Sequence, residues 1–243
     1  MLKIRIIPTL LWKDYTLVKG TSFDSWRRVG TILPAINVFN AREVDEIMVL
    51  DIGASRESHE PDYATVAEFS AECEMPMTIG GGIASCEHVR KLLAAGADKV
   101  LINSAAYDNL DLVTQSAKSF GSQCIVVSID ARRENGRHMC YSHSGSRATG
   151  KEAGEWAETV AGAGAGEILI TSIENDGVMQ GYDIELIRKV SGSVDIPVIA
   201  QGGAGGYEDM YRALSEGKAQ AVSASSIFLF TEATPLEAKK YLA

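Results

Sequence analysis

The chain has 243 residues, of which 46% are hydrophobic and 23% are charged, and its formal net charge at pH 7 is −9. These proportions are ordinary for a globular protein that can bury a large core, and they exclude the disordered and fibrous classes. The acidic balance, without any run of more than two basic residues, also argues against a nucleic-acid partner.

The cysteines give no sign of a metal site or a disulfide framework. Cys73, Cys86, Cys124 and Cys140 lack the paired spacing that either would need. The apolar stretch near the N-terminus is too short for a signal peptide or a membrane span. We therefore expect a cytoplasmic protein with no metal, no cofactor and no membrane contact.

Short apolar runs rich in β-branched residues alternate with amphipathic segments along the whole chain. They predict eight strands, at residues 4–11, 46–52, 75–80, 98–103, 123–130, 167–173, 196–202 and 219–225. Strands that are apolar throughout fit a parallel sheet covered on both faces, and their alternation with helices fits βαβ units. The sequence therefore predicts an α/β fold, a single (β/α)₈ TIM barrel that occupies residues 1–243 as one domain. A doubly wound open sheet is the alternative.

Helices are predicted between the strands, most clearly at residues 87–95, 110–120 and 154–163. Gly96 and Gly121 fall where helix C-caps belong. Two longer segments, 14–34 after the first strand and 131–151 after the fifth, are interpreted as loops. Long loops after barrel strands usually act as lids or contact the substrate.

The two halves of the chain resemble each other. Four residue identities recur at an offset of 121, the difference between 167 and 46: Glu46 with Glu167, Asp62 with Asp183, Gly81 with Gly202, and Ser104 with Ser225. The sequence therefore predicts two fused (β/α)₄ half-barrels, and a ligand site in one half should recur in the other.

Glycine-rich turns at 79–83 and 201–206 each follow an apolar strand. Glycine lets the backbone approach a ligand closely, and in each half a segment of small residues then opens a helix, at 102–106 and 223–227. A glycine turn beside a helix N-terminus is the recurring phosphate site of this barrel. We expect a bis-phosphorylated small molecule, or two phosphate ions, at Gly81, Gly82, Asn103, Ser104, Gly202, Gly203, Ala224 and Ser225. The alternative is a pair of tight turns without a ligand.

A family resemblance covers nearly the whole chain. It is carried by the segments RIIP, VKG, EIMVLDI, TIGGGI, ADKVLINSAA, VVSIDARR, EILITSIENDG, GYD and PVIAQGGAG. With these segments the chain resembles the cyclase subunit of imidazole glycerol phosphate synthase, the HisF family. The resemblance implies a lyase/cyclase that uses ammonia from a partner glutaminase and cleaves a bis-phosphorylated ribulosyl aminoimidazole carboxamide nucleotide.

The resemblance also implies two catalytic aspartates, at the ends of strands one and five. Asp130 matches the second, whereas Leu11 stands at the position of the first. Asp14 matches a different aspartate of the family pattern, so we do not expect it to replace the lost one. Further residues implied in substrate binding, each of which could instead cap a helix or brace a loop, are Lys19, Asp51, Ser144, Thr171, Asp176 and Gly177.

Charged residues begin four of the predicted strands: Arg5, Glu46, Lys99 and Glu167. This spacing predicts a ring at the bottom of the barrel, which could simply close it with salt bridges. The resemblance implies instead that the ring gates an ammonia channel along the barrel axis and that Asp98 helps to dock the glutaminase. The expected partner is therefore a glutaminase subunit in a heterodimer.

These features leave two main hypotheses for function. In the first, the chain is a channel and scaffold that passes ammonia to a third protein, an amidotransferase acting on a sugar or glycan, and has little cyclase chemistry because of Leu11. This resembles a branch of the family associated with surface-polysaccharide genes, and segment 30–34 and Gln201 also depart from the histidine-pathway pattern. In the second, the chain is the cyclase itself, with an unorthodox acid. A sugar-phosphate isomerase of a related barrel family is a weaker third.

Overall fold

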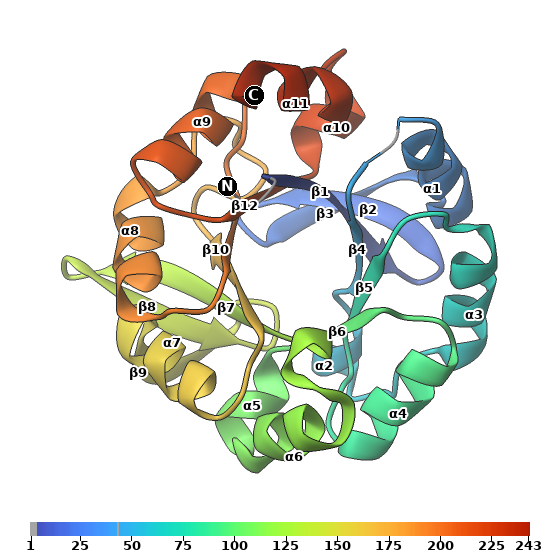
Figure 1. Cartoon of the computed structure of the whole chain (residues 1–243), viewed down its shortest axis with the longest axis vertical. Coiled ribbons are helices and arrows are strands. Elements are labelled where there is room, and N and C mark those ends of the chain that lie inside the picture. Colours follow the sequence, from blue (N-terminus) through green and yellow to red (C-terminus); the bar gives the residue numbers. More distant parts are fainter. Residues whose placement is uncertain (1–3, 43) are drawn as a thin grey trace.

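The computed structural model describes residues 4–42 and 44–243, and within them eight parallel strands close into a barrel surrounded by helices (Figure 1). The barrel strands are β1 (Arg5–Lys13), β4 (Ile47–Asp51), β5 (Met77–Gly80), β6 (Lys99–Ile102), β7 (Ile125–Glu134), β10 (Glu167–Ser172), β11 (Val198–Gln201) and β12 (Ala221–Ala224). Closure comes from two pairings, β12 with β1 and β10 with β7. The predicted (β/α)₈ barrel is confirmed, and the open sheet is excluded.

Helices cover the outside of the strands (Figure 1). The longer ones are α1 (Ile32–Ala41), α3 (Tyr63–Glu72), α4 (Cys86–Ala94), α6 (Asp111–Phe120), α7 (Ala153–Gly162), α8 (Ile184–Ser193), α9 (Tyr207–Ser215) and α11 (Pro235–Leu242). Short turns of helix lie at α2 (Ala54–Glu57), α5 (Ser104–Asp108), η1 (Ser122–Cys124) and α10 (Ser226–Phe230). The three helices predicted from sequence lie within one residue of α4, α6 and α7.

Two helices begin in the same way in the two halves. The Asp62 carboxylate accepts a hydrogen bond from the backbone N–H of Thr65 at 3.0 Å, and Asp183 accepts one from Leu186 at 2.9 Å. Each aspartate therefore satisfies a free N–H group at the start of its helix, α3 or α8. The sequence repeat thus corresponds to equivalent local structure.

The barrel axis is filled by one apolar layer. Its buried side chains are Ile7, Met48, Leu101, Val126, Leu169, Ile199 and Ala221. Because alternate residues of a strand point to the same face, Arg5, Thr9 and Leu11 of β1 share the inward face with Ile7. Leu11 therefore lies at the C-terminal mouth of the barrel and Arg5 at the opposite end.

The segments 14–34 and 131–151 are not the loops that the sequence analysis expected. β1 pairs with β2 (Thr16–Thr21), which pairs with β3 (Asp24–Gly30), while β7 pairs with β8 (Arg137–Ser142), which pairs with β9 (Arg147–Glu152), all antiparallel. β1 and β7 run past the barrel wall and expose N–H and C=O groups that these hairpins satisfy. The buried side chains of β8 are His138, Cys140 and Ser142, so no alternation of apolar and polar residues marked this strand in the sequence.

No helix formed by residues 4–42 and 44–243 combines the length and apolar character that crossing a membrane requires.

Candidate active site

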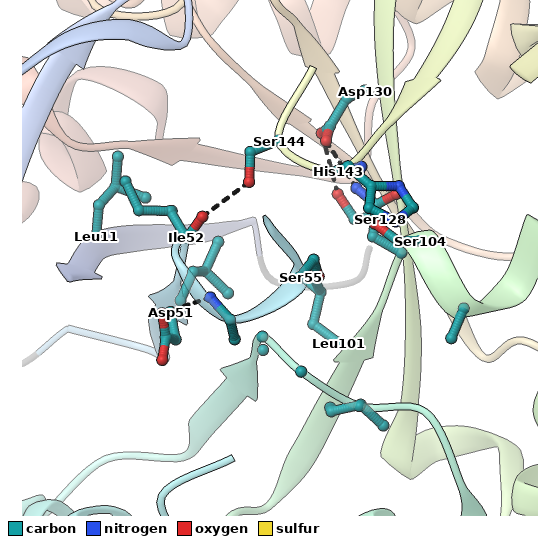
Figure 2. Close-up of a pocket in the computed structure, with 18 of the residues that line it drawn as sticks. Leu11, Asp51, Ile52, Ser55, Leu101, Ser104, Ser128, Asp130, His143 and Ser144 are labelled. Carbon is teal, nitrogen blue, oxygen red and sulfur yellow. Dashed lines mark hydrogen bonds between the residues drawn. The ribbon is translucent and has the colours of Figure 1, made fainter. Parts of the chain in front are cut away.

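The C-terminal ends of the strands surround a cavity of about 370 Å³, called here the large cavity. The residues predicted from sequence that line it are Leu11, Asp51, Gly81, Gly82, Asn103, Ser104, Asp130, Ser144, Thr171 and Asp176. Figure 2 shows Leu11 and Asp51 on one side and Asp130, His143 and Ser104 on the other. The large cavity mainly belongs to the N-terminal half of the barrel.

A second cavity of about 20 Å³, the small cavity, lies beside it. The predicted residues that line it are Lys19, Asp176, Gly177, Gly202, Gly203, Ala224 and Ser225. Leu11, Asp176 and Gln201 line both cavities, so the two adjoin at the centre of the mouth. The structure therefore brings every predicted mouth residue to one of two neighbouring cavities.

Asp130, in β7, is a buried carboxyl group in the wall of the large cavity. Burial raises its pKa from 3.8 to about 7, although hydrogen bonds from Asn103 (2.7 Å) and Ser128 (3.3 Å) favour the charged form and lower it. The negative charge of Asp176 raises it further. A carboxyl group that titrates near neutrality can either give or take a proton.

Leu11 brings no titratable atom to the opposite side of the mouth. It pairs with Leu50 of β4 and Val18 of β2, and its side chain is buried. Asp14 has a φ of 47° in the turn between β1 and β2 and lines neither cavity. The acid–base pair that the family resemblance implies is therefore represented in this structure by Asp130 alone.

Lys19 and Asp176 form an ion pair in the wall of the small cavity. The Lys19 ammonium lies 3.0 Å from both carboxylate oxygens of Asp176, and the side chains are 3% and 8% exposed. The pair joins β2 to the loop after β10, segments 157 residues apart in sequence. It gives the small cavity a fixed cation held against a carboxylate.

Asp51, at the end of β4, has a structural role in the large cavity. Its Oδ1 atom accepts hydrogen bonds from the backbone N–H groups of Gly53 at 2.9 Å and Ala54 at 3.1 Å. Burial raises the pKa of Asp51, against the opposing effect of these two hydrogen bonds. The carboxylate thereby holds the start of α2 beside the cavity.

The glycine turns are required by the packing of the backbone. Gly81 has a φ of +112° and Gly203 a φ of +113°, a region that side chains rarely adopt. A Cβ atom at Gly81 would lie 2.4 Å from the carbonyl oxygen of Asp51, and one at Gly203 would lie 2.1 Å from that of Gly181. Each cavity therefore has a position in its wall that requires glycine, and this requirement exists without a ligand.

The two equivalent serines have different surroundings. Ser104 Oγ accepts a hydrogen bond from the backbone N–H of His143 at 2.9 Å, so its own O–H can still donate. Ser225 Oγ is buried and has no hydrogen-bond partner among the described residues. Buried polar groups are nearly always paired, so the unpaired hydroxyl of Ser225 in the wall of the small cavity indicates a place for a ligand oxygen.

Sequence reasoning missed the histidines of the large cavity. His59, His88 and His143, three of the four in the chain, line it, and its lining contains neither lysine nor arginine in the described part of the chain. His143 falls in segment 131–151, next to the predicted Ser144, whereas His59 follows α2 and His88 lies in the first turn of α4. Their convergence depends on the fold, and no spacing in the sequence signals it.

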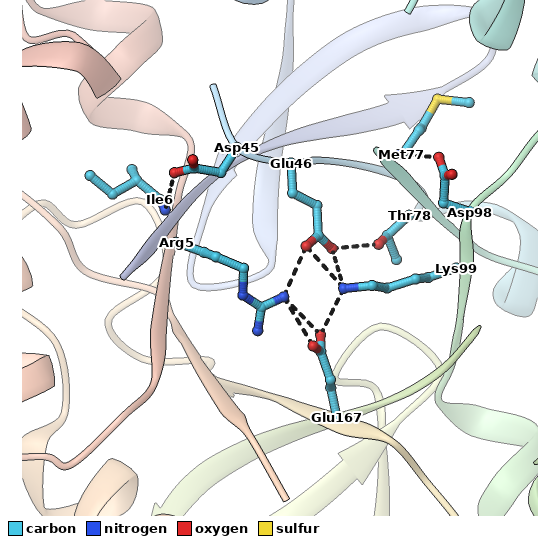
Figure 3. A network of polar contacts seen from close by, with 9 residues as sticks. All are labelled: Arg5, Ile6, Asp45, Glu46, Met77, Thr78, Asp98, Lys99 and Glu167. Atoms are coloured by element: carbon cyan, nitrogen blue, oxygen red, sulfur yellow. Dashed lines mark hydrogen bonds and ion pairs between the residues drawn. The ribbon is translucent and has the colours of Figure 1, made fainter. Parts of the chain in front are cut away.

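The opposite end of the barrel holds the predicted charged ring (Figure 3). Arg5 contacts Glu46 at 2.9 Å and Glu167 at 3.0 Å, and Lys99 contacts the same two carboxylates at 3.0 and 3.1 Å. Two cations and two anions thus alternate in a closed network across the axis. This geometry is compatible with a plug and with a gate.

Asp98 lies beside this ring and is exposed. Its Oδ2 atom accepts a hydrogen bond from the backbone N–H of Met77 at 2.8 Å, which positions the carboxylate at the end of the barrel. Within the described residues, no group of three or more histidine, cysteine, aspartate or glutamate side chains is arranged to hold a metal ion.

Fold and site together define a (β/α)₈-barrel protein with two adjoining cavities at its mouth and the buried carboxyl group of Asp130 in the wall of the larger one. The model of the family described as "Histidine biosynthesis protein" matches residues 5–234, and the chain belongs to this family. Its similarity to named relatives identifies it more closely as a HisF-type barrel.

Three relatives illustrate this similarity. The chain is 44% identical to imidazole glycerol phosphate synthase subunit HisF of Chlorobaculum tepidum and 46% identical to that of Dehalococcoides mccartyi, over 100% of this chain and 96% of each relative. It is 43% identical to a putative imidazole glycerol phosphate synthase subunit hisF2 of Vibrio vulnificus, over 98% of this chain and 88% of the relative.

Proposed function

We propose that this chain is a cyclase subunit of the imidazole glycerol phosphate synthase type. Asp130 carries the proposal, because its buried carboxyl group, with a pKa raised to about 7, lies in the wall of the large cavity, which adjoins the small one. The names of the relatives also favour this function over the channel-and-scaffold hypothesis that the sequence analysis placed first.

The substrate would be the bis-phosphorylated aminoimidazole carboxamide nucleotide. One phosphate binds at the glycine wall of the large cavity with Ser104, and the other binds in the small cavity with Ser225 and its free hydroxyl. The ligand then crosses the shared boundary of the cavities at Leu11, Asp176 and Gln201. This pose brings the middle of the ligand to the wall that holds Asp130.

Ammonia would reach the mouth from a glutaminase bound at the opposite end of the barrel. The ring of Arg5, Glu46, Lys99 and Glu167 lies between that end and the apolar layer of the axis, where it could gate the passage. Asp98 is exposed beside the ring and is available to a cation of the partner. The proposed assembly is a heterodimer with the glutaminase on this end.

The interface can be tested with two substitutions at one position. Asp98→Lys should weaken the heterodimer by about 2 kcal/mol or more if the charge is buried against a partner cation. Asp98→Asn is the matched control, since an amide oxygen can still accept from Met77 while the charge is lost. Equal affinity of Asp98→Lys and the wild type, measured by titration calorimetry, would place the interface elsewhere.

One observation favours a second function. Leu11 lies at the mouth opposite Asp130 and cannot transfer a proton. A barrel with this change could still receive ammonia and pass it to a third protein, an amidotransferase that modifies a sugar or glycan. This is the role implied by the resemblance to the surface-polysaccharide branch.

Turnover separates the two functions. The wild type, Leu11→Asp and Asp130→Asn are assayed with the aminoimidazole carboxamide nucleotide and an ammonium salt. The proposal predicts turnover by the wild type and a loss of about 10²- to 10⁴-fold in Asp130→Asn, the usual effect of removing a positioned acid or base. Turnover confined to Leu11→Asp would reject cyclase activity of the natural chain and favour the scaffold.

A further inference from the structure

The tip of the β8–β9 hairpin has an unusual backbone. His143 and Ser144 both have a φ of +52°, and Gly145 has a φ of +76°. Residues other than glycine seldom adopt this left-handed region. Such conformations persist when surrounding contacts fix them, and they are concentrated at functional sites. The contacts that hold the tip in this conformation therefore indicate what its side chains are positioned to do.

Several hydrogen bonds hold the tip over the large cavity. Arg56 of α2 donates to the carbonyl oxygens of His143 at 3.2 Å and Ser144 at 2.6 Å. Ser144 Oγ donates to the carbonyl oxygen of Ile52 at 2.8 Å, and the N–H of His143 donates to Ser104 Oγ at 2.9 Å. The hairpin is thereby fastened to the segments that follow β4 and β6, both of which line the large cavity.

These contacts also orient the His143 side chain. Its Nδ1 atom lies 3.0 Å from the hydroxyl of Ser142, a residue that is 2% exposed. His143 lines the large cavity, and among the described residues no hydrogen bond or ion pair engages its Nε2 atom. When Nδ1–H donates to Ser142, the lone pair of Nε2 can accept a proton. Figure 2 shows His143 on the same side of the large cavity as Asp130 and Ser104.

The other titratable groups near the centre of the mouth are engaged. Both oxygens of Asp176 contact Lys19, and Asp51 accepts from two backbone N–H groups. His59 faces Asp51 at 3.9 Å and His88 faces Glu60 at 3.7 Å. Around the hairpin tip, the charged groups are Asp130 of β7, Arg56 of α2, and the exposed ion pair of Arg147 with Asp108 of α5.

We infer that His143 is the second proton-transfer group of the mouth, acting with Asp130 in place of a group that β1 does not supply. The inference rests on the proposed cyclase function and names a catalytic residue for it. The nitrogen of ammonia and the ketone oxygen of the substrate are bound to the same carbon when ammonia adds, so they lie close together. His143 and Asp130 can therefore act on them from the same side of the mouth.

The step balances as follows. The lone pair of ammonia forms a bond to the ketone carbon of the substrate, the C=O π electrons move to oxygen, and that oxygen takes the proton of Asp130. The nitrogen gives one proton to Nε2 of His143. The imidazolium then protonates the hydroxyl, which leaves as water, while the nitrogen gives a second proton to Asp130. An imine is formed, and both side chains return to their starting states.

The test is His143→Asn, because asparagine tolerates a positive φ and keeps the hairpin turn. With the nucleotide and ammonium salt, kcat should fall about 10²-fold while KM changes little. The pH profile of kcat should lose the limb that reports the imidazole, and added imidazole should restore part of the rate. Arg147→Gln, on the same hairpin but exposed and outside the lining of the cavity, should leave kcat unchanged.

Three results would overturn the inference. If the wild type turns over and His143→Asn keeps its rate and both limbs of the profile, His143 is not catalytic, and the cyclase function stands. If the wild type is inactive while Leu11→Asp is active, His143 does not supply the missing group. If neither turns over, the cyclase function fails, and the inference fails with it.

Discussion

The large and small cavities occupy corresponding places in the two halves of the barrel, yet they differ in size and charge. Both have a glycine with a positive φ at the matching position of the repeat, Gly81 in one and Gly202 in the other. The large cavity measures about 370 Å³ and contains histidines and carboxyl groups, whereas the small cavity measures about 20 Å³ and contains Lys19. The two halves thus share the backbone conformation of these turns, whereas the side chains that differ between the halves determine the chemistry of each cavity.

The hairpins account for this difference. β2 extends from β1 and inserts Lys19 into the small cavity, where the lysine pairs with Asp176. The β8–β9 hairpin instead lies beside the large cavity, with His143 at its tip fastened to Ser104. The same barrel therefore offers one compact site with a permanent cation and one open site suited to proton transfer.

The largest effect expected from this comparison is a dependence of stability on pH that originates in the large cavity. Burial raises the pKa of Asp130 from 3.8 to about 7, so between these values the folded chain binds a proton that the unfolded chain releases. The contribution of Asp130 to stability is therefore fully present below pH 4 and is lost as pH rises toward 7, a change on the order of 4 kcal/mol.

This pH dependence is measured by urea unfolding of the wild type and Asp130→Asn across that range. As pH rises, the free energy of unfolding of the wild type should fall relative to that of Asp130→Asn. A difference that does not change with pH would mean that Asp130 is charged in the folded protein at all these values, and that the large cavity does not hold a neutral acid.

A smaller effect is expected from the ion pair of the small cavity. Lys19→Met leaves the Asp176 carboxylate buried without its cation and should cost about 3 kcal/mol, near the low end for a broken buried pair because the carboxylate borders a cavity. Lys13→Met is the control, since Lys13 pairs with Glu57 at 3.5 Å on the surface and should change stability by less than about 1 kcal/mol. Equal costs of the two substitutions would show that the Lys19–Asp176 pair contributes no more to stability than the surface pair of Lys13 with Glu57.

The smallest effect tests the shared glycine walls. Gly81→Ala and Gly203→Ala should each cost about 1 to 3 kcal/mol, because both positions combine a positive φ with a close carbonyl oxygen. Gly206→Ala is the control, with an extended φ of −156° and no atom within 4 Å of a new Cβ. The three variants are compared by thermal unfolding, and a substitution at Gly81 or Gly203 that costs no more than Gly206→Ala would contradict the requirement for glycine at that position.

The barrel, its glycine turns and its charged ring could be read from sequence because each depends on position along a strand. A residue that ends or begins an apolar run must lie at the mouth or the bottom, as Gly81 and Lys99 do. The ion pair of Lys19 with Asp176 could not be read in this way, because its partners are 157 residues apart and meet only through a hairpin. The position of His143 likewise depends on the antiparallel pairing of β8 with β7 and β9, which the sequence analysis did not predict.

The central claim is that the mouth binds one ligand through two phosphate groups, one in each cavity. Crystals soaked first with inorganic phosphate and then with the bis-phosphorylated nucleotide test it most directly. The account predicts two anions, one near Gly82 and Ser104 and one near Gly203 and Ser225, which the two phosphates of the nucleotide then replace. Anions in neither place, or side chains that fill both cavities, would contradict it.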